Sequence, residues 1–365
     1  MSIESTPTGY ARLSRFQARA VLAAFVLSLI GCLAISLSPL KSGFIGSPRS
    51  KRSDVELYRA EVARIAGGEG YYEVAADELP AREYPTASVF NWRTPLPMWL
   101  LGVLPSPLVG KVLLGLLALA ALGMALAWLA KTCPPPLVML GGLAISGALM
   151  FSVLGDLYVM PVIWAGVLIL LSLSAFGLDK TRIAVAAGLA AVFVRDLAGP
   201  YCVAALVIAA SRRQWREAGA WLLGLTAYAL FFAAHCWTVS GLITAEAISH
   251  NESWLCLGGA AFLISAAQMH AYLISLPQWI AAVFLPLTLL GFAGWHSPSG
   301  QRAGMVAAMY CLLFAVIGHD FNQYWGAMLM PTLCLGFAHA PAALRDLCRA
   351  AGYRSSRVNL STSGA

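Results

Sequence analysis

Residues Ser53–Pro97 have the sequence SDVELYRAEVARIAGGEGYYEVAADELPAREYPTASVFNWRTPLP, which is polar and rich in charge. They lie between two apolar runs, 20–40 and 107–130, each close to the roughly 20 residues that a helix needs to cross a bilayer. Irregular polar backbone is not tolerated in lipid, so a polar insert between two spans must lie on one side of the membrane. We therefore interpret 41–106 as a large loop outside the hydrocarbon that ends in a re-entrant, proline-broken segment.

The composition places the whole chain in the membrane class. Of its 365 residues, 59% are apolar and 11% are charged, and the mean hydropathy is +0.73. These values are far from those of a soluble domain. We predict an all-α integral membrane protein with about ten transmembrane helices, near residues 20–40, 107–130, 137–153, 157–177, 183–195, 198–211, 218–238, 277–295, 304–318 and 325–340.

This pattern predicts one polytopic domain, 20–340, between a cytoplasmic N-terminal tail, 1–19, and a cytoplasmic C-terminal tail, 341–365, which we expect to be disordered from Arg345 onward. The first apolar run resembles a signal peptide but is long for one, so we expect a retained anchor. A second large external segment is predicted at 239–276. Within it, 256–274 is nearly long enough to span, but a crossing there would invert everything downstream, so we favour an interfacial or re-entrant helix.

The positions of basic residues predict the orientation. With the N-terminus in the cytoplasm, the inner segments hold fourteen bases and four acids, a net of +10, whereas the outer segments hold ten bases and thirteen acids, a net of −3. This asymmetry follows the positive-inside rule. The overall +7 is thus a topology signal, and without aromatic-interleaved basic patches it does not indicate nucleic-acid binding.

The spacing of the cysteines and the content of Arg, Ala and Gly give two further expectations. The eight cysteines form no CxxC and no Cys/His metal pattern, so we expect free thiols. Nineteen of the 24 basic residues are Arg, and Ala and Gly are abundant, which suggests a GC-rich bacterial genome and hence an inner-membrane location.

The start of the insert predicts a short amphipathic helix. Val55, Tyr58, Val62 and Ile65 recur at helical spacing, and Gly67-Gly68 supplies a stop.

Two acids open this helix, and each has two interpretations. Ser53 with Glu56 forms a capping-box pattern, and Asp54 in the first turn complements the helix dipole. Because capping needs only one of the two acids, we favour a catalytic role for Asp54.

Tyr72 and Arg93 are further candidates in the insert. Tyr72 belongs to a set of aromatic residues that suit a membrane interface whether or not they touch a substrate. Arg93 lies where the chain re-enters the membrane. There a guanidinium either contacts lipid headgroups or holds a substrate phosphate with a bidentate fork.

Polar residues in the turns between spans complete the candidate set. Ionisable groups at membrane depth are costly and usually face a cavity or one another. Arg195 and Asp196 lie in a turn between two short apolar runs, where they form either a substrate site or a structural ion pair. Asp156, His319 and Asp320 are expected on the same face as the insert and are candidates for donor or metal binding.

This arrangement resembles the GT-C superfamily of glycosyltransferases, which use polyprenyl-phosphate sugars. The resemblance rests on Asp54-Val55-Glu56 early in the first loop, Tyr71-Tyr72, the re-entry at Arg93-Thr94-Pro95-Leu96, and Asn322-Gln323-Tyr324-Trp325 before Pro331 in the last span. Gln323 departs from the pattern, because Arg is usual there.

The resemblance implies a lipid-linked sugar donor, an extracytoplasmic site, Asp54 as base and a supporting role for Glu56. It also implies that Tyr324 binds substrate and that a divalent metal, Mg²⁺ or Mn²⁺, could be held by Asp54 and Glu56.

We therefore expect an inverting transferase that moves a hexose or pentose, for example mannose, from a polyprenyl-phosphate carrier to an external glycan, lipid or protein. Asp54 would take the acceptor proton, and Arg93 and Arg195 would stabilise the departing phosphate. Three alternatives remain open: a transporter or flippase of lipid-linked glycans, a non-catalytic membrane subunit, and another enzyme of lipid-linked glycans such as a ligase or polymerase.

Overall fold

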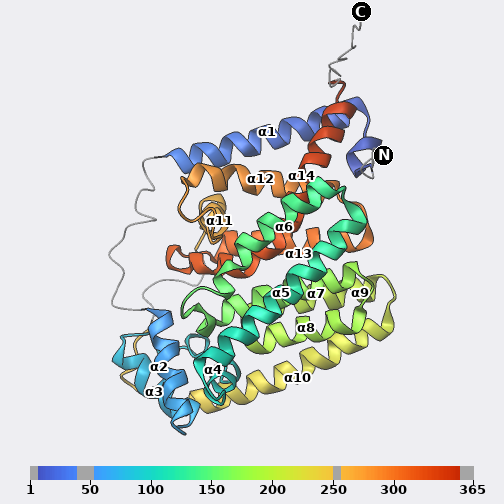
Figure 1. The fold of residues 1–365 in the computed structure, drawn as a ribbon. Helices are drawn as coiled ribbons and strands as arrows, with labels where there is room; N and C mark the ends of the chain where they lie inside the picture. Colours follow the sequence, from blue (N-terminus) through green and yellow to red (C-terminus); the bar gives the residue numbers. More distant parts are fainter. Residues whose placement is uncertain (1–6, 39–52, 250–255, 354–365) are drawn as a thin grey trace, which may run out of the picture.

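The computed structural model describes residues 7–38, 53–249 and 256–353, and this part of the chain is built from helices (Figure 1). Among the described residues, six helical segments are long and apolar enough to cross a membrane: Arg15–Leu37, Pro107–Thr132, Pro135–Ser152, Trp215–Ser240, Pro298–Ile317 and Asp320–Ala350. The chain therefore has the composition and helix lengths of an α-helical integral membrane protein. Over the described residues, β-structure is limited to one isolated bridge between Cys256 and Ile317.

The apolar helices match the ten predicted runs in order. They are α1 (Arg15–Leu37), α5 (Pro107–Thr132), α6 (Pro135–Leu149), α7 (Pro161–Gly177), α8 (Thr181–Val194), α9 (Gly199–Ser211), α10 (Trp215–Ser240), α12 (Gln278–Gly294), α13 (Pro298–Ile317) and α14 (Gly326–Ala350). Short 3-10 turns η4 (Met150–Ser152), η6 (Asp196–Ala198) and η7 (Asp320–Trp325) extend α6, α9 and α14. Four of the ten, α7, α8, α9 and α12, are shorter than a full crossing.

The helices of the bundle run between two ends of the molecule. The insert end holds α2 (Asp54–Ala66), α3 (Tyr71–Ala81), α4 (Leu96–Gly102) and α11 (Gly259–Ala267) (Figure 1). The opposite end, where α1 begins, is called the basic end below. Asp156, in the turn after α6, forms an ion pair with Arg59 of α2, so that turn lies at the insert end as predicted.

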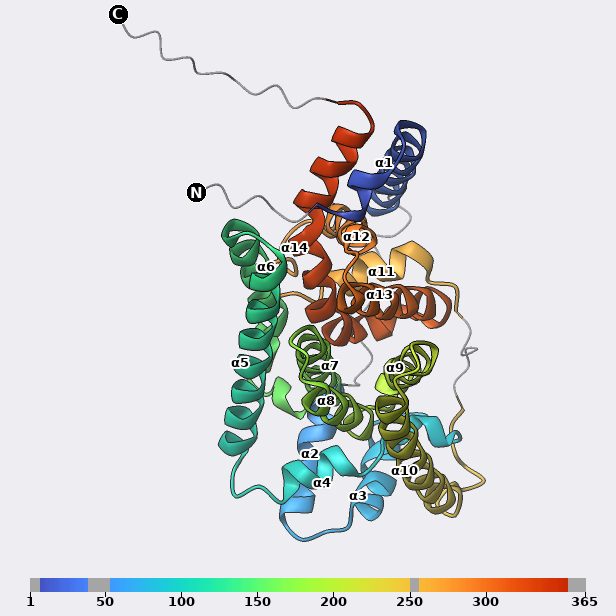
Figure 2. The same ribbon diagram turned by 90° about the vertical axis from the view of Figure 1, so that its right-hand side faces the viewer.

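Helix α14 forms the centre of the packing. It contacts α12, α6 and α7, and most of its side chains are buried inside the bundle. Gly291 of α12 lies so close to Gly336 of α14 that an added Cβ would come within 1.9 Å of the Gly336 carbonyl oxygen. Such small-residue contacts let membrane helices approach closely. By contrast α1 and α10 are mostly exposed, so lipid would cover them. They lie on opposite sides of the bundle, with α5 and α6 along a third side (Figure 2).

A buried ion pair joins two helices at the basic end. Arg302 Nη1 of α13 lies 2.7 Å from Glu217 Oε1 of α10, and the two side chains are 4% and 6% exposed. The Arg302 guanidinium also lies 3.7 Å from the centre of the Phe176 ring, and Trp221 Nε1 donates to the same Glu217 oxygen at 3.3 Å. Arg302 and Glu217 belong to the fourteen bases and four acids counted for the inner side, and in the structure they are buried and form a clamp between two helices.

The C-terminal part of the described chain is more ordered than predicted. Helix α14 continues through Arg345 to Ala350, and Asp346 accepts hydrogen bonds from the Thr8 backbone N–H at 2.9 Å and hydroxyl at 3.1 Å. The expected disorder from Arg345 is therefore wrong up to Tyr353, because Asp346 ties the helix to the N-terminal segment. Residues 354–365 lie outside the described residues.

The ambiguous segment 256–274 does not form a spanning helix. Its only α-helix among the described residues, α11, has nine residues and packs against α12, α13 and η7. Phe262 is fully buried there, so the segment enters the bundle and does not lie flat on its surface. This outcome supports the re-entrant alternative.

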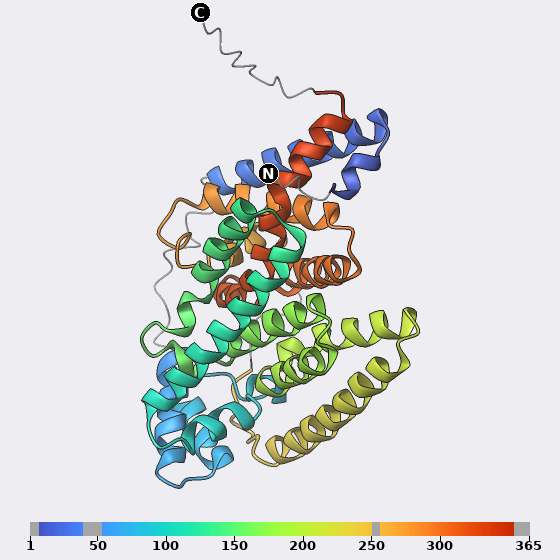
Figure 3. The ribbon, with the colours of Figure 1, turned by 45° about the vertical axis from the view of Figure 1, so that its right-hand side comes forward.

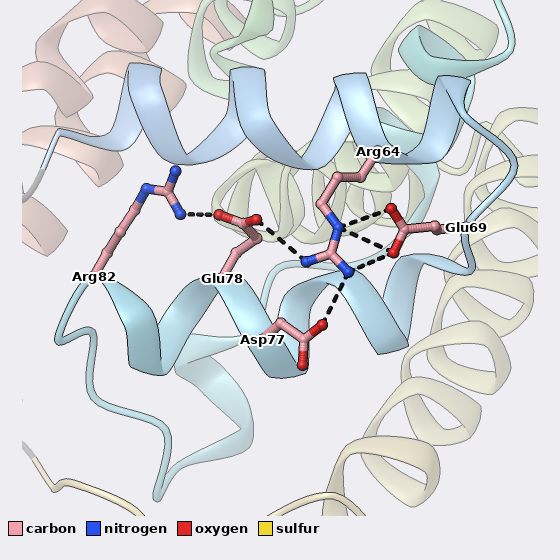
Figure 4. A network of polar contacts seen from close by, with 5 residues as sticks. All are labelled: Arg64, Glu69, Asp77, Glu78 and Arg82. Atoms are coloured by element: carbon pink, nitrogen blue, oxygen red, sulfur yellow. Dashed lines mark hydrogen bonds and ion pairs between the residues drawn. The ribbon is translucent and has the colours of Figure 1, made fainter.

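Two helices of the insert, α2 and α3, are joined by an ionic network (Figure 4). The predicted helix is confirmed as α2, and Gly67 and Gly68 end it, the latter with φ of +96°. Arg64 of α2 bonds Glu69, Asp77 and Glu78, and Glu78 also pairs with Arg82. The α3 helix that carries Asp77 and Glu78 was not predicted.

Candidate functional site

Short helices carry Arg195 to a point inside the bundle. Helix α8 has 14 residues and α9 has 13, so each is about 20 Å long, well under the roughly 30 Å of hydrocarbon. Both pack against the 26-residue α10 (Figure 3). The turn between them therefore lies at membrane depth, and Arg195 is 5% exposed there.

Asp54 is the first residue of α2 and is half-buried. The Ser53 hydroxyl caps the helix by accepting from the Glu56 backbone N–H at 3.4 Å. That leaves the Asp54 carboxylate for another partner, and the Tyr84 hydroxyl donates to its Oδ1 at 2.7 Å. Glu56 is exposed, so the cap uses its backbone and not its acid.

Arg93 lies between η3 (Val89–Asn91) and α4, beside the middle of α2. Its Nε donates to the Tyr58 hydroxyl at 3.1 Å, and its backbone carbonyl accepts from the Tyr71 hydroxyl. Within the described ranges, Arg93 forms no ion pair with a carboxylate. Its positive charge is therefore held by the fold and left without a direct counter-ion.

Tyr58 of α2 lies near residues that are far from it in the sequence. It lies within electrostatic range of Asp54, Arg93, Arg195 and Tyr324, and Tyr324 in turn interacts with Asp54, Arg93 and Arg195. Arg195 Nη1 lies 3.4 Å from Asp196 Oδ1, and Asp196 also interacts with Arg93. We call this set the insert-end cluster; its members are Asp54, Tyr58, Tyr84, Arg93, Arg195, Asp196 and Tyr324.

Five candidates chosen from the sequence thus meet in one place, namely Asp54, Arg93, Arg195, Asp196 and Tyr324. They come from α2, the re-entry, the α8–α9 turn and η7, which are far apart in the chain. The Arg195 Nε atom is buried and has no hydrogen-bond partner among the described residues. A buried donor of this kind usually finds a partner, so its position is consistent with a bound ligand.

Glu61 is a residue of this region that the sequence analysis did not select. It lies on α2 at 2% exposure, and its Oε2 atom is buried with no partner in the described part of the chain. Burial raises the pKa of its carboxyl to about 8, although Arg93 and Arg82 act in the opposite direction. Asp54, Tyr58 and Glu61 are spaced i, i+4 and i+7, which is one helix face, and this spacing was the available signal.

Tyr72 lies beside the cluster and has a different partner. Its hydroxyl is 3.1 Å from His235 Nδ1 of α10, and the two rings are stacked with centres 5.7 Å apart. His235 is 1% exposed, and its Nε2 has no partner among the described residues. The aromatic residue predicted for an interface therefore packs against α10.

For Asp156 and His319 the structure shows other partners. Asp156 Oδ2 and Oδ1 pair with Arg59 at 2.9 Å and Lys111 at 3.0 Å, which makes it a structural link between α2 and α5. His319 stacks on Phe321 with ring centres 5.0 Å apart, and Asp320 is an exposed residue that opens η7.

The residues do not favour the suggested metal pair. Asp54 and Glu56 are two positions apart on a helix, so their side chains leave in different directions, and Glu56 is exposed. Over the described ranges, no three His, Cys, Asp or Glu side chains converge as metal ligands. The cysteines that the structure describes are free thiols.

Comparison of the chain with protein families, with curated proteins and with solved structures finds no match.

Proposed function

We propose that the chain is an integral-membrane glycosyltransferase of the GT-C type, which transfers a sugar from a polyprenyl-phosphate carrier to an external acceptor. One observation carries this proposal. A half-buried carboxylate, Asp54, shares a cluster with two arginines, Arg93 and Arg195, beside the turn that joins the short helices α8 and α9. An acid near fixed positive charges is the combination that transfer from a lipid phosphate requires.

Asp54 acts as the base in this mechanism. It removes the proton from the acceptor hydroxyl while that oxygen attacks the anomeric carbon, and the bond from that carbon to the phosphate oxygen breaks. A single displacement inverts the anomeric centre. Tyr84, which donates to Asp54 Oδ1, holds the carboxylate so that its other oxygen faces the acceptor. Glu56 has no direct part, since it is exposed.

Arg93 and Arg195 stabilise the negative charge that develops on the leaving phosphate. Tyr58 orients Arg93 through a 3.1 Å hydrogen bond, and Asp196 orients Arg195 at 3.4 Å. Guanidinium groups match phosphate oxygens with paired hydrogen bonds, which suits this role. Tyr324 borders the same charges and would contact the sugar or phosphate.

We further propose that the ten apolar helices lie in the membrane, with α8 and α9 as a hairpin that turns within it, both termini in the cytoplasm and the insert outside a bacterial inner membrane. Reporter fusions test this orientation: a fusion at residue 75 should report outside, and one at residue 214 inside. The reverse result would place the cluster in the cytoplasm and end the proposal.

The decisive experiment is transfer by Asp54→Asn. Purified enzyme in nanodiscs would be given radiolabelled polyprenyl-phosphate mannose and other lipid-linked sugars, with membrane glycans as acceptors and without nucleotide sugar. Loss of a general base should lower the rate about 10²–10⁴-fold. Asp77→Asn is the matched control, because Asp77 is an exposed acid of the same insert outside the insert-end cluster.

Full transfer by Asp54→Asn would remove Asp54 from the mechanism. Movement of an intact lipid-linked glycan across vesicles, without sugar transfer, would instead support a flippase. A complex that keeps its activity with Asp54→Asn would support a non-catalytic subunit.

A further inference from the structure

Glu61 is a residue of α2, Arg93 bonds Tyr58 of the same helix, and Arg195 interacts electrostatically with Tyr58. The Glu61 Oε2 and Arg195 Nε atoms are both buried without hydrogen-bond partners in the described part of the chain. Arg93 interacts with Glu61 through space but forms no ion pair with it. A buried polar atom without a hydrogen-bond partner is costly, so a ligand that bonded these atoms would bind favourably.

Burial and the neighbouring charges determine the protonation state of the Glu61 carboxyl. Arg93 acts on it from the re-entry, Tyr71 from α3, Arg82 from the residue that follows α3, and Asp54 from its own helix. Burial outweighs the two arginines and raises the pKa of the Glu61 carboxyl to about 8, and burial also holds the pKa of Tyr71 well above its ordinary value. At neutral pH, Glu61 is therefore mostly an uncharged acid that can donate a hydrogen bond.

A protonated acid changes what Arg93 can bind. A carboxylate at Glu61 would repel an anion on Arg93, whereas a carboxylic acid adds a donor beside it. We propose that Glu61 is a proton-carrying binding residue, which donates its hydrogen to an oxygen of a phosphate group held by Arg93. This inference rests on the proposed function only in its ligand class, a phosphate ester.

A proton-linked phosphate site follows from this arrangement. If only protonated Glu61 accepts the anion, then affinity must fall as pH rises through the range in which Glu61 ionises, and phosphate binding must in turn favour proton uptake. The Arg side chains remain charged throughout that range. A structural role for Glu61 would affect folding but would give phosphate affinity no such pH dependence.

The test measures binding of farnesyl phosphate to the detergent-solubilised full chain by calorimetry between pH 7.5 and 9.5. A phosphate monoester has a second pKa of about 6, so the probe keeps its charge over this range. We expect the Kd of the wild type to rise about 20- to 30-fold over these two pH units, from one ionisation near pH 8.

Glu61→Gln keeps a neutral hydrogen-bonding group but cannot ionise, so its Kd should change less than about twofold over the same range. Glu73→Gln is the matched control, because Glu73 is an exposed acid of the same insert, and it should follow the wild type. Inorganic phosphate forms a second arm. If the Kd for inorganic phosphate changes with pH as much as the Kd for farnesyl phosphate, the phosphate group alone is recognised. If only the Kd for farnesyl phosphate changes with pH, the ligand is the lipid phosphate.

A pH-independent Kd in the wild type, or no binding of either probe, would overturn the inference whether or not Glu61→Gln folds. An unchanged slope in folded Glu61→Gln would do the same. The proposed function is separable, because a steep pH slope without sugar transfer supports the phosphate site alone, and transfer with a flat slope supports the function alone.

Discussion

The buried pair between α10 and α13 gives a quantitative test of the fold. Glu217→Gln would leave Arg302 charged at 4% exposure with its 2.7 Å counter-ion gone. Removing one partner of a buried pair costs about 3–5 kcal/mol, because the remaining charge is uncompensated. The contact of Arg302 with Phe176 does not replace that charge. We therefore expect Glu217→Gln to lower the free energy of unfolding by about 3–5 kcal/mol.

Unfolding can be followed by tryptophan fluorescence during SDS titration in mixed micelles. The double variant Glu217→Gln/Arg302→Met removes both charges, so it should be more stable than Glu217→Gln alone. Asp179→Asn is a control at the same end, since its ion pair with Lys131 spans 3.9 Å and Asp179 is 94% exposed. This control should match the wild type. A loss below about 1 kcal/mol for Glu217→Gln would refute the buried clamp.

Three further outcomes are expected. Tyr84→Phe removes the 2.7 Å donor to Asp54. Transfer should fall about tenfold or more, since a hydrogen bond to a charged group contributes about 1.5–3 kcal/mol, and an unchanged kcat would contradict the orienting role of Tyr84. Arg64→Met removes the centre of the network in Figure 4, so limited proteolysis should cut the insert faster than in the wild type. Burial raises the pKa of the Glu61 carboxyl to about 8, so the stability that this protonated side chain contributes is fully present below its pKa in the unfolded chain and is lost as pH rises toward 8. The unfolding temperature of the wild type should therefore fall more between pH 5 and pH 8 than that of Glu61→Gln.

Hydropathy predicted the helices well because each apolar run has one stable conformation in lipid, a helix that satisfies its own backbone. Helix ends were harder to predict, since local caps decide them. The first helix starts at Arg15 because Ser14 and Gln17 form a capping box, and α13 starts at Pro298 because Ser297 caps it. Neither cap changes the hydropathy of the run.

The candidate site was predictable where charge at membrane depth was the signal. Arg195, Asp196 and Arg93 were found in this way, and the structure brings them together. Glu61 was missed because an acid in a polar insert is expected to face water, and only the tertiary packing of α3 and the re-entry buries it. The link between Tyr72 and His235 joins positions 163 residues apart, and no local pattern encodes that pairing.

The short α8 and α9 have a consequence for biosynthesis. Neither helix alone can span the bilayer, and the turn between them carries a charged pair, so the insertion machinery should not release them into lipid one at a time. They should partition together, after α10 has emerged to cover them. A nascent chain that stops before residue 240 would then expose Arg195 to lipid and become a substrate for quality-control proteases.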